Sequence, residues 1–194
     1  MKLLLITGNK YKLAAARKGL ERTGIEIEAL KMETPELQSL NSKEIADYSA
    51  KFAAEKLQKP VIVTDASWQF EGLNGFPGPF AKFMNNWFSM KDYQRLLKGV
   101  KNREAKIIEV VSYCKPGEQP KSFQGSCEGT LSLKPRGKRG FPLDRLFIPK
   151  GKSKTSAQMK EKEMTEFWVG MGHWKKLAKF MKEEKNGKNQ VRYF

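Results

Sequence analysis

The sequence predicts an α/β fold in which a mixed sheet with flanking helices is divided into two lobes by a central cleft. Short apolar runs alternate with helical segments over the first third of the chain, and the middle is rich in strands separated by proline and glycine turns. With 39% hydrophobic residues, the 194-residue chain can bury a sizeable core. We therefore expect residues 1–194 to form one domain with two lobes.

Two strand–helix pairs are expected in the N-terminal part. Residues 2–6 are an apolar run that stops at a Thr-Gly-Asn triplet, and residues 12–22 carry leucine and alanine at helical spacing. Residues 25–30 alternate apolar and acidic side chains as a half-buried strand does, and residues 42–57 form an alanine-rich segment after a capping-type asparagine.

A third strand directs attention to Asp65. Residues 61–63 are a β-branched run, so Asp65 is expected at the carboxyl end of a buried strand. Ligands of open α/β sheets bind at such ends.

The rest of the chain is expected to contain a stiff loop, a long helix, a β meander and a C-terminal helix. The loop covers residues 72–79, and the helix at residues 80–98 carries Phe83, Trp87 and Tyr93 on its apolar face. The remaining elements are expected as strands at residues 106–113, 122–124 and 128–133 and a helix at residues 174–184.

The chain is strongly basic. Its 37 lysines and arginines against 21 acidic residues give a formal charge of +16, which attracts polyanions and equally favours general solubility. Charge alone does not choose between a nucleotide and a nucleic acid as the partner. Residues 134–162 hold ten basic residues against two acidic ones and form the strongest local candidate for contact with phosphate.

Export, membrane insertion and a disulfide framework are not indicated. The first apolar run is far shorter than a signal-peptide core or a membrane span. Cys114 and Cys127 lack the spacing of metal ligands, and one optional pair is no disulfide framework in a domain of this size. A reduced, cytoplasmic protein is expected.

The loop after the first strand is a candidate phosphate cradle. Thr7, Gly8 and Asn9 precede a helix N-terminus, where backbone N–H groups bind anions, and Lys12 follows one turn later. The spacing is not that of a P-loop, and an ordinary strand–helix turn would look the same.

Glu36 and Asp65 are a candidate pair of ligands for Mg²⁺, which binds one or two carboxylates together with phosphate and water. Alone, each is more typical of a solvated surface carboxylate.

Seven motifs, in order over nearly the whole chain, resemble those of the inosine/xanthosine triphosphate pyrophosphatase (Ham1/RdgB-like) family. The segment from Leu73 to Phe80 is the most specific of them. The motifs are TGNxxK from Thr7, PELQ from Pro35, VTD from Val63, LNGFPGPF from Leu73, GFxxDxxF from Gly140, TxAxM from Thr155 and EK from Glu161.

The resemblance implies a nucleotide cleft, a homodimer and Mg²⁺-dependent hydrolysis of a purine nucleoside triphosphate to the monophosphate and pyrophosphate. It assigns phosphate contacts to Thr7, Asn9 and Lys12, metal binding to Glu36, and metal binding or water activation to Asp65. It also implies that Phe141 stacks on the base, that Asp144 reads the base edge and that Lys162 hydrogen-bonds the base.

Several family positions differ in this chain. Ala15 and Thr64 stand where the family has acids, and Ser49 stands where it has a lysine. The Ser-His-Arg triplet expected soon after Lys162 is missing, since residues 165–168 read TEFW; His173, the only histidine, follows a few residues later. A lone histidine beside a tryptophan is more often a packing residue than a substitute ligand.

Three interpretations remain open. The favoured one is retained pyrophosphatase chemistry with altered base selectivity. The alternative is a weakly active or inactive protein that binds nucleotide or nucleic acid through its basic surface, aided by Trp168 and Trp174. A third interpretation is that the aromatic residues at 167–174 only form a dimer or lobe contact.

Overall fold

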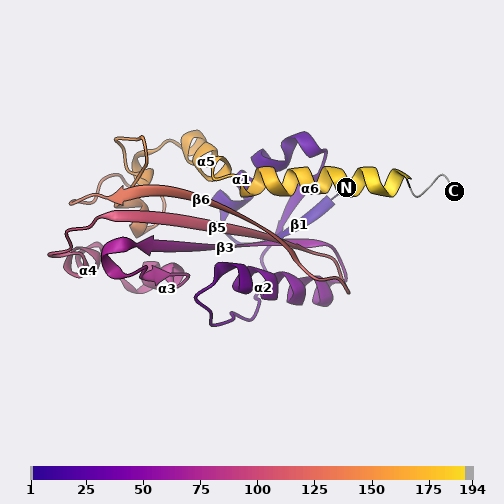
Figure 1. Cartoon of the computed structure of the whole chain (residues 1–194), viewed down its shortest axis with the longest axis horizontal. Helices are drawn as coiled ribbons and strands as arrows, with labels where there is room; N and C mark the ends of the chain where they lie inside the picture. Colours follow the sequence, from indigo (N-terminus) through magenta and orange to yellow (C-terminus); the bar gives the residue numbers. More distant parts are fainter. Residues whose placement is uncertain (1, 191–194) are drawn as a thin grey trace.

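The computed structural model describes the backbone of residues 2–190 and the side chains of residues 2–186. A single mixed sheet of seven strands runs through the molecule, in the order β2-β1-β3-β5-β6-β7 with β4 paired to β3 (Figure 1). The strands are β1 (Lys2–Ile6), β2 (Glu26–Leu30), β3 (Val61–Phe70), β4 (Pro77–Gly78), β5 (Glu104–Cys114), β6 (Lys121–Leu131) and β7 (Phe147–Pro149). The predicted mixed α/β fold is therefore confirmed.

Helices cover both faces of the sheet. Helix α2 packs on one face, and α1, α5 and α6 lie on the other (Figure 1). The helices are α1 (Lys10–Leu20), α2 (Ser42–Leu57), α3 (Ala81–Trp87), α4 (Met90–Leu96), α5 (Glu161–Gly170) and α6 (His173–Gln190). No helix of the described part is both long and apolar enough to cross a membrane.

Asparagines cap the first two helices, so that α2 begins at its predicted residue and α1 begins two residues before its predicted start. Asn9 Oδ1 accepts a hydrogen bond from the Tyr11 N–H at 2.9 Å, and Asn41 Oδ1 accepts one from the Lys43 N–H at 3.0 Å. Both helices bury alanine-rich faces. Small side chains let α1 and α2 approach the sheet closely.

Strand β3 extends well beyond its predicted end, so the placement of Asp65 at the end of a strand is wrong. The antiparallel pairing with β5 runs from Val61 opposite Cys114 to Phe70 opposite Ala105. The parallel pairing with β1 reaches only Ile62. Asp65 thus lies inside a ten-residue strand, but at the point where that strand has passed the end of its parallel neighbour. The edge of β3 that faces β1 is therefore open beside Asp65.

Two further predictions about the elements are wrong. The helix expected at residues 80–98 is divided into α3 and α4, because Ser89 caps a new helix by accepting from the Asp92 N–H. Tyr93 is buried as expected, whereas Trp87 is 74% exposed. The strands expected at residues 122–124 and 128–133 are one continuous strand, β6, which pairs with β5 along its length.

Candidate active site

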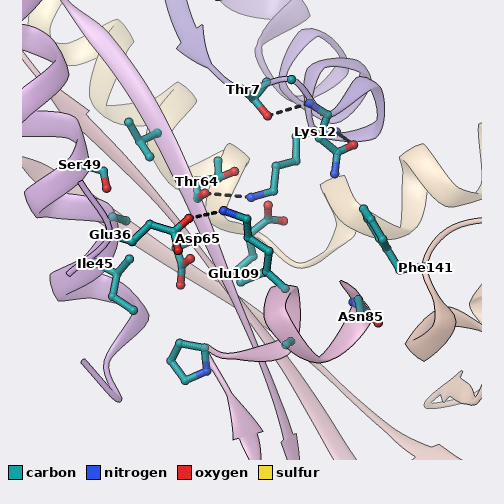
Figure 2. Close-up of a pocket in the computed structure, with 18 of the residues that line it drawn as sticks. Thr7, Lys12, Glu36, Ile45, Ser49, Thr64, Asp65, Asn85, Glu109 and Phe141 are labelled. Carbon is teal, nitrogen blue, oxygen red and sulfur yellow. Dashed lines mark hydrogen bonds and ion pairs between the residues drawn. The ribbon is translucent and has the colours of Figure 1, made fainter. Parts of the chain in front are cut away.

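A cavity of about 650 Å³ opens between the sheet, the N-terminus of α1, α2, α3 and the loop that carries Phe141. Figure 2 shows Thr7 and Lys12 on one side of it, Glu36 and Asp65 on another, and Phe141 across from them. Of the predicted site residues, Thr7, Gly8, Asn9, Lys12, Glu36, Asp65, Phe141 and Asp144 line this cavity. Residues far apart in the sequence are therefore brought together as expected.

The strand–helix loop presents donors to the cavity. Thr7 Oγ1 accepts a hydrogen bond from the Asn9 N–H at 3.0 Å, which shapes the turn into α1. Lys12 extends from the first turn of α1, and its Nζ donates to the Thr64 carbonyl oxygen at 2.9 Å. The lysine ammonium is thereby held at the open edge of β3, beside a helix N-terminus that favours anions.

Asp65 is a partly buried carboxylate in this cavity. Burial raises the pKa of Asp65 above its usual range, and the positive charge of Lys12 opposes the shift. Its Oδ2 has no hydrogen-bond partner among the described residues. Glu36 is more exposed and forms an ion pair with Lys82 of α3. The two acids share the cavity without bonding to each other.

Asp144 and Phe141 form the opposite end of the cavity. Asp144 is 3% exposed, its Oδ2 accepts a hydrogen bond from the Phe141 N–H at 2.7 Å, and its Oδ1 has no partner among the described residues. Burial raises the pKa of Asp144 to about 6, although the hydrogen bond from Phe141 opposes the shift. The Phe141 ring is about half exposed. Asn85 supports this loop by accepting from the Leu143 N–H at 3.3 Å.

Glu109 lines the cavity and is a site residue that the sequence reading missed. It lies within β5 and is 2% exposed. Its Oε2 is 3.2 Å from Nε2 of His173, outside hydrogen-bond geometry, so neither atom has a hydrogen-bond partner among the described residues. The available signal was a single glutamate inside the apolar run at residues 107–111.

Other predicted contacts lie outside the cavity. Lys162 is exposed on α5 and is not among the lining residues, and none of the basic side chains of residues 134–162 reaches the cavity. His173 and Trp174 are completely buried, as packing residues are. Trp168 lines the cavity, so the aromatic segment divides between the core and the site.

The cavity is acidic although the chain is basic. Four carboxylates line it, those of Glu36, Asp65, Glu109 and Asp144, against the two lysines Lys12 and Lys82. A polyanion entering such a cavity needs a cation to offset the repulsion. The unpartnered oxygen of Asp65 and the neighbouring Glu36 suit Mg²⁺. The described residues contain no cluster of three or more His, Cys, Asp or Glu side chains that could enclose a metal, so phosphate and water would have to complete its coordination.

Comparisons with known proteins agree with this geometry. The Ham1 family model matches residues 3–186. The chain is 43% identical to the dITP/XTP pyrophosphatase of Methanopyrus kandleri over 82% of its own length and 85% of that protein. It is 35% identical to the dITP/XTP pyrophosphatase of Methanothermobacter marburgensis over 94% and 97% of the two chains. A Ham1 protein of Coxiella burnetii has the same fold, with a TM-score of 0.78 and 22% identity over 94% of this chain and 99% of that one. The resemblance seen in the sequence is thus confirmed, and the chain belongs to the Ham1 family.

Proposed function

We propose that this protein is a Mg²⁺-dependent nucleoside triphosphate pyrophosphohydrolase that converts a non-standard purine triphosphate to the monophosphate and pyrophosphate. The observation that carries the proposal is the arrangement of one cavity, with Lys12 and the α1 N-terminus at one end and Phe141 and Asp144 at the other. The names of the two archaeal relatives, both dITP/XTP pyrophosphatases, support the same reaction.

The triphosphate fits the end that carries Lys12. The ammonium group and the backbone N–H groups after Thr7 neutralise phosphate charge, and the Lys12 bond to Thr64 holds the ammonium in place before the substrate binds. When bound, Mg²⁺ supplies charge neutralisation and polarises the phosphate to be attacked. Asp65 and Glu36 are the residues that would hold it.

Asp65 is also placed to act on the attacking water. Its raised pKa makes it a better proton acceptor than a solvated carboxylate, and Lys12 still favours its ionised form. A water held by Asp65 would lose a proton to its carboxylate as the water oxygen bonds to the α-phosphorus and the bond from that phosphorus to the α–β bridging oxygen breaks. The pyrophosphate then leaves with the electron pair of that bond.

The base fits the end that carries Phe141 and Asp144. The half-exposed phenyl ring offers a stacking surface, and the ionised Asp144 carboxylate only accepts hydrogen bonds. Hypoxanthine, xanthine and guanine present an N1–H donor to it, whereas adenine presents an N1 lone pair. Asp144 therefore favours 6-oxopurines. The Ser-His-Arg clamp is replaced in this chain, and Trp168 lines the cavity instead, so we also propose that the base selectivity differs from that of the family.

The test is a pyrophosphate-release assay with Mg²⁺ over a panel of deaminated, ordinary and modified ribo- and deoxyribonucleoside triphosphates. We expect turnover of at least one 6-oxopurine nucleotide and its loss in Asp65→Asn. A wild-type protein that releases pyrophosphate from no member of the panel would refute the proposal.

A second candidate function is nucleic-acid binding without catalysis. The basic side chains of residues 134–162 lie mainly on the surface and outside the cavity, which leaves them free for a polyanion. Trp174, however, lies in the core and is not available for stacking on bases. Binding of an oligonucleotide that weakens steeply with salt would favour this candidate, and salt-independent or absent binding would remove it. The homodimer stays a prediction for size-exclusion chromatography.

A further inference from the structure

Asn85 lies at the end of the cavity that carries Phe141 and Asp144. It belongs to α3, is partly exposed and lines the cavity. Figure 2 shows its side chain on the same side of the cavity as Phe141, away from Asp65. Its Oδ1 accepts a hydrogen bond from the N–H of Leu143, the residue before Asp144. Adjacent Cα atoms are about 3.8 Å apart, so this bond holds the Asn85 amide close to Asp144.

Two donors from the core fix the orientation of the Asn85 amide. Leu143 donates its backbone N–H, and the buried Tyr93 donates its hydroxyl group to the same Oδ1 at 3.2 Å. A backbone N–H can only donate, and burial raises the pKa of Tyr93, which keeps the phenol protonated. The amide oxygen of Asn85 therefore faces the core. The amide nitrogen, at the other end of the same planar group, has no hydrogen-bond partner among the described residues.

Asp144 and Asn85 together present an acceptor and a donor to one end of the cavity. Asp144 Oδ1 has no partner among the described residues, and the Asn85 amide nitrogen carries two N–H groups. A 6-oxopurine offers the complementary pair on neighbouring atoms, an N1–H donor and a 6-oxo acceptor. Adenine offers the reverse pair, an N1 acceptor and a 6-amino donor. A site with both side chains therefore rejects adenine more strongly than Asp144 alone would.

We propose that the Asn85 amide donates a hydrogen bond to the 6-oxo oxygen of the base, beside the bond from N1–H to Asp144. The proposal rests on the proposed function, because that function places the base at Phe141 and Asp144. It adds a specificity-determining residue that none of the seven sequence motifs contains. Hypoxanthine, xanthine and guanine all carry a 6-oxo group, so Asn85 selects against adenine in ribonucleotides and deoxyribonucleotides alike.

The variant Asn85→Asp removes the donor and keeps the support of the loop. One carboxylate oxygen can accept from Leu143 and Tyr93 as the amide oxygen does, and the other replaces the N–H donor with an acceptor. Asn86→Asp is the matched control, because it adds the same charge at the next residue, which is exposed and also lines the cavity. The added charge repels every triphosphate, so the ratio of two kcat/KM values isolates the effect on the base.

The first test compares kcat/KM for ITP and ATP at about pH 8, where Asp144 and the introduced carboxyl group are both ionised. We expect Asn85→Asp to lower the ratio of ITP to ATP by at least about tenfold, because the 6-oxo group loses a donor and the 6-amino group of adenine gains an acceptor. The control should keep the wild-type ratio within about twofold. A ratio in Asn85→Asp that is no lower than in the control would overturn the proposal.

A change in the ligand tests the same contact. The nucleotide 6-thio-ITP keeps the N1–H, sugar and triphosphate of ITP but replaces the 6-oxo oxygen with sulfur, which accepts hydrogen bonds only weakly. We expect wild type and Asn86→Asp to prefer ITP by about fivefold in kcat/KM, and Asn85→Asp to lose that preference. An equal preference in all three proteins would show that the size of the sulfur atom, and not Asn85, causes the difference, and would overturn the proposal.

Binding of the monophosphate product separates this proposal from the proposed function. The side-chain amide NMR signals of Asn85 are identified as the pair that disappears in Asn85→Asp. We expect IMP to shift these signals in the wild-type protein, and 6-thio-IMP to shift them less. Bound IMP that leaves the signals unchanged would overturn the proposal even if triphosphates are hydrolysed. A shift caused by IMP in a protein that hydrolyses no nucleotide would support the contact of Asn85 with the base and refute the proposed function.

Discussion

Replacing Asp144 with asparagine should stabilise the protein at neutral and alkaline pH. The carboxylate is buried, and it accepts only one hydrogen bond from the described residues, from Phe141. An asparagine oxygen can accept the same bond, and the variant removes the buried charge. In the proposed function that carboxylate serves as the hydrogen-bond acceptor for the base.

The magnitude follows from the pKa of Asp144, which is about 6 against an ordinary value of 3.8. This difference of about two pKa units corresponds to about 3 kcal/mol. Between these two pH values the folded state holds a proton that the unfolded state has lost, so the free energy of unfolding falls as the pH rises through this window. Above about pH 6 the buried charge lowers the free energy of unfolding by its full amount, and below about pH 4 this loss is absent.

The measurement is urea unfolding of wild type and Asp144→Asn at about pH 8 and about pH 4.5. We expect the variant to gain up to about 3 kcal/mol at the higher pH and much less at the lower pH; an unpartnered amide nitrogen reduces the gain. Asp92→Asn is a control with the opposite sign, because hydrogen bonds from Ser89 lower the pKa of Asp92. A stability difference for Asp144→Asn that does not change with pH would contradict a raised pKa of Asp144 in the folded protein.

Three further predictions concern catalysis, substrate binding and the core. Asp65→Asn should lower kcat for pyrophosphate release by at least about 10²-fold, because it removes the proton acceptor; a variant with wild-type kcat would remove Asp65 from the chemistry. The KM for a 6-oxopurine nucleotide should rise as the pH falls below about 6, where Asp144 becomes protonated, and Asp144→Asn should abolish this dependence; a pH-independent KM in wild type would contradict the role of Asp144. Trp174→Ala should destabilise the fold by about 3–5 kcal/mol in urea unfolding, because the side chain is completely buried against α1; a loss below about 1 kcal/mol would contradict the packing.

Local patterns were sufficient to predict the N-terminal half of the fold. Alternation, helical spacing and the asparagine caps place β1, α1, β2 and α2 within a few residues of their observed bounds. The length of β3 could not be predicted, because its second half is held by β5, some forty residues later in the chain. A different pairing, with the preceding strand β5 in an antiparallel hairpin, joins two short predicted strands into β6.

Most of the predicted site residues belong to short sequence motifs, and these residues line the cavity. The loop from Thr7 to Lys12 and Asp65 were candidates from their local sequence and Asp144 was one from the resemblance, and the structure places all of them along one cavity. Glu109 was missed because its buried environment is formed by Gly125 and His173. These residues are distant from it in the sequence, and no local pattern connects them to it. Lys162 was assigned by resemblance alone and does not line the cavity.

The most direct test of the account is Mg²⁺-dependent pyrophosphate release from XTP, ITP and dITP compared with ATP and GTP. We expect at least one of XTP, ITP and dITP to be converted to its monophosphate and pyrophosphate faster than ATP. Asp65→Asn and the removal of Mg²⁺ should each abolish that reaction. Absence of pyrophosphate release from every nucleotide, with the wild-type protein folded and Mg²⁺ present, would contradict the account.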